Sequence, residues 1–145
     1  MKTQGKISKF IYAITLFFIT LSGFAQMPIF KRYYIADIPG FSWLAKYYVT
    51  HSMHYIAAIV LMACAAFFIV DFILNRPFHK IYLTGYYKII LLAGLIITGC
   101  LLVIKNMPGV YFNHNMIIAL DLMHLGFCMM FLAVALYTMI KKRKT

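Results

Sequence analysis

Charged side chains are scarce in this sequence, and acidic ones are the scarcest. The 145 residues include 14 basic and 3 acidic side chains, and 64% of the residues are hydrophobic. An average soluble domain is only about half apolar. The shortage of charge argues against a soluble globular protein, because so much apolar surface must face lipid or other membrane protein.

Closely spaced cysteines are also missing. Cys64, Cys100 and Cys128 lie far apart, each within an apolar run. A membrane enzyme that forms disulfides would need a neighbouring pair of thiols such as C-x-x-C, so this class of function is excluded. We expect the three cysteines to be small buried hydrophobic residues.

The net charge of +11 would suggest a nucleic-acid partner in a soluble protein. Here the basic residues flank apolar runs, so membrane topology and lipid headgroups explain them and no nucleic-acid partner is expected. Four spans put both termini on one side, together with 10 of the 14 basic residues. The positive-inside rule therefore predicts cytoplasmic termini.

Four apolar runs are long enough to cross a bilayer, which takes about 20 residues. Proline and glycine separate them, at Pro39-Gly40, Pro77 and Pro108-Gly109. We predict an all-α, integral membrane four-helix bundle, built as two tandem hairpins in a single membrane domain over 1–145. The expected helices are 10–30, 42–74, 86–105 and 114–140.

The first run has a second interpretation. A basic start, an apolar core and the small residues around Ser22-Gly23-Phe24-Ala25 are also typical of a secretory signal peptide. Cleavage would leave three spans. We prefer an uncleaved helix, because the apolar character continues to Phe30 and the third run repeats its ending.

The two halves of the chain are weakly similar. Ser22-Gly23 near the end of the first run corresponds to Thr98-Gly99 near the end of the third, and a Met-Pro dipeptide follows each. The next run carries a central histidine in both halves, His54 and His124. Ionisable side chains inside apolar spans are costly and usually functional.

The two histidines lie at matched depth. His54 is eight residues beyond Lys46 and His124 is nine beyond Asn115, so both lie about 12–14 Å inside the boundary at a rise of about 1.5 Å per residue. Two imidazoles at one depth can ligate a haem iron from opposite sides, and such iron favours electron transfer. We therefore predict one haem b with these axial ligands, with a second haem as an alternative.

Other residues are candidates for contacts with this haem. Gly23 and Gly99 lack side chains and would leave room for a porphyrin, while Arg32 could meet the propionates. His51 and His114 are candidate propionate contacts or supporting groups. Each histidine could instead form only a hydrogen bond between helices, which would fit a cofactor-free membrane anchor or a small transporter-like bundle.

The Ser/Thr-Gly pairs, the prolines after them and the histidines of the following helices resemble the four-helix membrane cytochrome b subunits of respiratory oxidoreductases. Formate dehydrogenase gamma and thiosulfate reductase cytochrome b subunits are examples. The segment from Tyr87 through Thr98-Gly99 and Pro108 to His124 is the most similar. The first span differs from the family in lacking a histidine, which favours one haem over two.

The resemblance implies a function. Such a subunit passes electrons between the quinone pool and an iron–sulfur or multihaem partner, here expected on the outer face. The protein would be a multi-pass subunit of a prokaryotic inner membrane, with quinone as substrate and no catalytic site beyond electron transfer.

Overall fold

The chain is all-α over the residues described by the computed structural model, which are 2–27, 37–75 and 83–143. Four long helices are present: α1 (Lys2–Ala25), α3 (Tyr47–Asn75), α4 (Leu83–Ile104) and α5 (His114–Arg143). A short 3₁₀ helix, η2 (Ser42–Ala45), precedes α3. Each long helix contains an apolar stretch long enough to cross a membrane. The predicted fold class is confirmed, and the protein is a multi-pass membrane protein.

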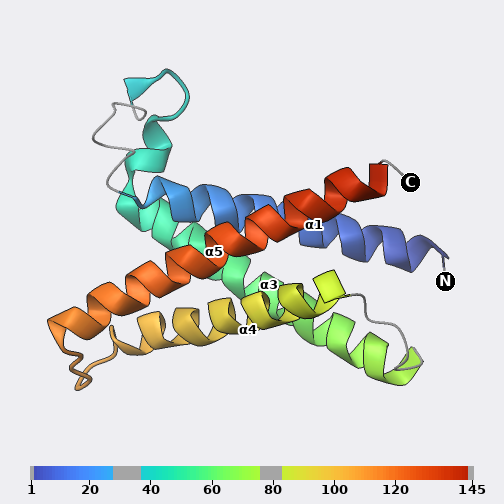
Figure 1. Ribbon diagram of the computed structural model, residues 1–145. Helices are drawn as coiled ribbons and strands as arrows, with labels where there is room; N and C mark the ends of the chain where they lie inside the picture. Colours follow the sequence, from blue (N-terminus) through green and yellow to red (C-terminus); the bar gives the residue numbers. More distant parts are fainter. Residues whose placement is uncertain (1, 28–36, 76–82, 144–145) are drawn as a thin grey trace. The chain divides into compact units, whose positions relative to one another are not determined.

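The helices form two hairpins, each a compact unit (Figure 1). Unit 1 (Met1–Arg76) pairs α1 with α3, and unit 2 (Pro77–Thr145) pairs α4 with α5. The prediction of a single membrane domain concerns how the units associate, and it stays a prediction.

In unit 1 the helices meet through small side chains. The buried residues Thr15 and Ser22 on α1 are seven apart, as are Thr50 and Ala57 on α3. Seven residues correspond to nearly two helical turns, so each pair lies along one face. Small residues let two helix backbones approach closely, which is how helices associate in lipid.

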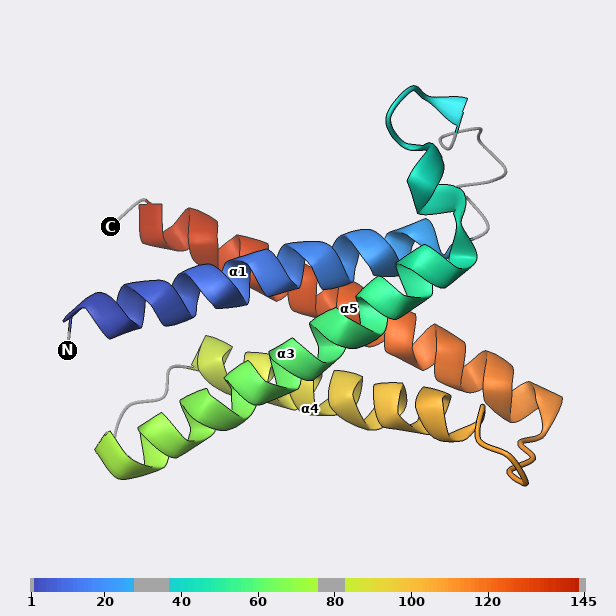
Figure 2. The ribbon, with the colours of Figure 1, turned by 180° about the vertical axis from the view of Figure 1, so that it is seen from behind.

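The start of α3 differs from the predicted helix 42–74. Ser42 begins η2, and the chain turns extended at Lys46 before α3 starts at Tyr47. Leu44 is buried, and η2 packs at one end of unit 1, where it contacts both α1 and α3 (Figure 2). The packing of Leu44 fixes the backbone of η2, so the chain cannot form one continuous helix from Ser42. The regular α-helix starts only after Lys46, at Tyr47.

In unit 2, α4 and α5 meet at a glycine and an aromatic ring. Gly94 on α4 lies directly against the Phe127 ring of α5. Thr98, Leu120 and Phe131 are buried in the same hairpin. α5 begins where Asn113 Oδ1 accepts a hydrogen bond from the Asn115 backbone N–H, an arrangement typical of a helix N-cap.

The cysteines are free thiols. Cys64 and Cys128 are half-buried, in line with the expected small apolar role, but Cys100 is exposed on α4. Within unit 2, the prediction that Cys100 is buried was therefore wrong. Residue 100 lies on a face of α4 that α5 does not cover.

Candidate functional site

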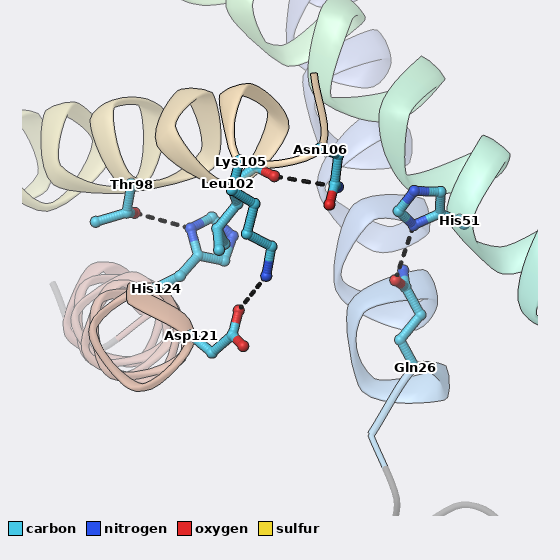
Figure 3. Close-up of polar contacts among 8 residues, drawn as sticks. All are labelled: Gln26, His51, Thr98, Leu102, Lys105, Asn106, Asp121 and His124. Carbon is cyan, nitrogen blue, oxygen red and sulfur yellow. Dashed lines mark hydrogen bonds and ion pairs between the residues drawn. The ribbon is translucent and has the colours of Figure 1, made fainter. Parts of the chain in front are cut away.

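The two predicted histidines each sit between the helices of their own hairpin. His54 extends from α3 toward α1, where Ser22 Oγ lies 3.0 Å from its Nδ1. His124 extends from α5 toward α4, where Thr98 Oγ1 lies 2.8 Å from its Nδ1 (Figure 3). Both imidazoles are half-buried. In both units a hydroxyl-bearing residue of the facing helix therefore contacts the histidine.

The glycine after each hydroxyl makes room for the imidazole. A Cβ built on Gly23 would lie 3.3 Å from His54 Cε1, and one on Gly99 would lie 3.4 Å from His124 Cε1. Both distances are at the short edge of ordinary contact, so a side chain there would push the ring. Ser22-Gly23 and Thr98-Gly99 thus act alike, as a hydroxyl that binds Nδ1 and a gap that admits the ring edge.

The hydroxyls themselves are buried. Ser22 is 0% exposed and Thr98 is 3% exposed. Ser22 Oγ also lies 2.7 Å from the carbonyl of Phe18, and Thr98 Oγ1 lies 2.7 Å from that of Gly94. In both hairpins the hydroxyl therefore links the histidine ring to the carbonyl one turn earlier in the facing helix.

One turn before each histidine the two hairpins differ. In unit 1 this position is His51, whose Nδ1 lies 3.3 Å from Gln26 Oε1 (Figure 3). In unit 2 it is Asp121, whose Oδ1 lies 3.4 Å from Lys105 Nζ. An aspartate in a membrane segment is either structurally paired or part of a proton or quinone site, and Asp121 has an ion partner.

His51 is held more firmly than a surface histidine. Its ring stacks on Tyr47 at 4.9 Å between centroids, and it packs against Tyr55 at 4.3 Å. Gln26 Nε2 donates to the Ser22 carbonyl at 3.2 Å, which orients the amide so that Oε1 faces the His51 ring. His51 is half-buried, and within the described part of the chain its side-chain hydrogen bond is the one between Nδ1 and Gln26.

Of the remaining predicted site residues, the structure describes His114 and not Arg32. His114 is the first residue of α5 and is exposed, ten residues before His124. Arg32, predicted as a propionate contact, lies outside the described residues. Within the described ranges, no group of three or more His, Cys, Asp or Glu side chains is placed to hold a metal ion.

The sequence predicts the histidines and glycines of the two hairpins but not the hydroxyl contacts. In the sequence Ser22 and Thr98 are only part of a weak repeat, and no pattern marks Gln26. The available signal was the placement of each hydroxyl immediately before a glycine in both halves. No protein-family model, curated protein or solved structure matches the chain.

Proposed function

We propose that the protein is a haem b-containing membrane subunit that transfers electrons between the quinone pool and a partner redox subunit. The observation that supports this most is the repeated setting of His54 and His124. Each imidazole is anchored at Nδ1 by a buried hydroxyl and flanked by a glycine. Ligating histidines usually have their second ring nitrogen held in this way.

The chemistry of the two histidines suits a haem. The donor set is chemically suitable, because neutral imidazoles are good ligands for haem iron. When bound, such a haem would supply a one-electron carrier without an open coordination position. His54 and His124 would hold its iron, and the lack of a Cβ at Gly23 and Gly99 would let each ring keep its position.

The haem content of the purified protein tests this proposal. We expect close to one haem b per chain when the protein is produced with ample haem, measured as the pyridine haemochrome and as b-type bands after reduction. Two haems per chain would support the two-haem alternative. A colourless protein with full helical circular dichroism would contradict the proposal and favour a cofactor-free membrane anchor or transporter-like bundle.

We place the quinone headgroup at His51 and Gln26. A quinone carbonyl needs a hydrogen-bond donor, and a hydroquinone hydroxyl needs an acceptor. A histidine can serve as either, because its neutral ring has one donor and one acceptor nitrogen. The contact that holds Gln26 against the His51 ring supports this assignment, as does the position of His51 one turn from His54.

Replacing His51 by alanine tests the quinone assignment. Reduction of the haem by a hydroquinone is expected to slow by roughly 10²-fold, the lower range for loss of a positioned proton-exchanging group, while haem content stays unchanged. Stopped-flow spectroscopy at the reduced b-type band measures this rate. Asp121→Asn is the matched control, since Asp121 holds the corresponding position in unit 2 and should leave the rate unchanged. Equal rates for the two variants would contradict the assignment.

We further propose that the termini face the cytoplasm and that the subunit works in the inner membrane of a prokaryote. The excess of basic residues on the side of the termini supports the orientation. An iron–sulfur or multihaem partner would then exchange electrons with the haem from the outer face of the membrane.

A further inference from the structure

We propose that Ser22 and Thr98 are positioning residues that select the tautomer of the two histidines. Each hydroxyl accepts a hydrogen bond from Nδ1–H, which leaves the lone pair on Nε2, the nitrogen that would bind iron. The role of Nε2 as an iron ligand rests on the proposed haem site. The tautomer itself is a property of the protein alone and can be measured without haem.

The Ser22 hydroxyl can donate one hydrogen bond, and three possible acceptors lie near it. Its Oγ lies 2.7 Å from the Phe18 carbonyl oxygen, 3.0 Å from that of Ile19 and 3.0 Å from His54 Nδ1. A carbonyl oxygen can only accept. If the proton pointed to Nδ1, two carbonyl oxygens would face the hydroxyl oxygen with no hydrogen between them.

The donors and acceptors around the Thr98 hydroxyl can be assigned in the same way. Its Oγ1 lies 2.7 Å from the Gly94 carbonyl oxygen, 3.2 Å from that of Leu95 and 2.8 Å from His124 Nδ1. Donation to Gly94 satisfies the shortest carbonyl contact and leaves the hydroxyl lone pairs for Nδ1–H. The contacts of Ser22 and of Thr98 thus lead independently to the same tautomer, with Nδ1 protonated, for both histidines.

Burial strengthens the assignment in both hairpins. Ser22 and Thr98 are almost completely inaccessible, so water cannot supply another donor or acceptor. A hydroxyl that donates to a carbonyl becomes a better acceptor, because hydrogen bonds in a chain polarise one another. The carbonyl–hydroxyl–imidazole chain would therefore hold the ring orientation and make Nε2 a stronger electron donor.

Nitrogen NMR on the haem-free full chain in detergent tests the tautomer directly. Imidazole ¹⁵N shifts are expected to show Nδ1 protonated and Nε2 unprotonated for His54 and His124 in the wild type. Replacement of each histidine by glutamine assigns the signals. In Ser22→Ala the His54 signals should move toward a mixture of tautomers, while those of His124 stay unchanged.

The reduction potential of the haem-loaded protein provides the second measurement. Ser22→Ala and Thr98→Val are each expected to weaken haem binding by about 10–100-fold, the range for loss of a group that supports a ligand. They should also shift the midpoint potential upward, because a weaker Nε2 donor stabilises ferric iron less. The conservative variants Ser22→Thr and Thr98→Ser should restore both properties.

Thr50→Val is the matched control. Like Ser22 and Thr98, Thr50 is buried, and it lies on α3. Its hydroxyl donates to the backbone carbonyls of Tyr47 and Lys46 and, among the described residues, hydrogen-bonds to no histidine. It should change neither the tautomers nor the potential. A shift equal to that of Ser22→Ala would show a merely structural role and overturn the inference.

The two proposals fail in different ways. A wild-type protein with Nε2 protonated on both histidines would overturn the tautomer assignment, even if it binds haem. A protein with Nδ1 protonated that binds no haem when haem is supplied would support the assignment and contradict only the proposed function.

Discussion

Replacing either His54 or His124 by alanine is expected to abolish haem binding by the purified protein. An axial imidazole contributes the iron–nitrogen bond, and alanine offers no atom in its place. The partner histidine alone would leave the iron with one protein ligand and an open position, which favours haem loss during purification. The measurement is the pyridine haemochrome per chain, compared with the wild type prepared in parallel.

His114→Ala is the control for this prediction, because His114 is exposed at the start of α5 and outside the hydroxyl-anchored setting. It should retain full haem content and an unchanged spectrum. Unaltered haem in both His54→Ala and His124→Ala would exclude these residues as ligands. Loss in only one of them would contradict ligation of one iron by both.

Replacing Gly94 by valine should strongly destabilise the hairpin of α4 and α5. A Cβ at this position would lie 3.0–3.1 Å from three atoms of the Phe127 ring, and the two further methyl groups of valine need more room still. Overpacking of this kind costs roughly 1–3 kcal/mol. We expect a lower unfolding temperature, followed with a thiol-reactive dye that reports the exposure of the half-buried cysteines.

Gly126→Ala is the control for Gly94→Val. Gly126 lies on α5, and a Cβ built there meets nothing within 4 Å. Alanine is favoured over glycine in a helix by about 0.5–1 kcal/mol, so the variant should be neutral or slightly more stable. A Gly94→Val protein as stable as Gly126→Ala would show that the contact with Phe127 does not hold the hairpin together.

The number of helices followed from the sequence, whereas their ends did not. Apolar runs mark the membrane-spanning part of a helix, but the helical backbone can continue into the polar residues that flank the run. α1 therefore starts at Lys2 instead of residue 10, and α5 extends to Arg143 instead of residue 140. The 3₁₀ turn before α3 depends on packing of Leu44, which no local pattern encodes.

The two histidines could be selected from the sequence by residue type, and their shared site stays a prediction. His54 and His124 stood out because histidine is costly in an apolar span. Their hydrogen bonds to Ser22 and Thr98 could not be predicted, because they depend on how each helix is rotated about its axis toward its partner. A single sequence with apolar residues on every face of a helix gives no measure of that rotation.

The division into hairpins also bears on how the protein is made. Every described contact that forms unit 1 lies within the first 76 residues, so α1 and α3 can pair while the ribosome is still producing α4 and α5. Insertion into the bilayer would then proceed two helices at a time. If the proposed haem takes one histidine from each hairpin, it can be bound only after the second pair of helices has entered the membrane.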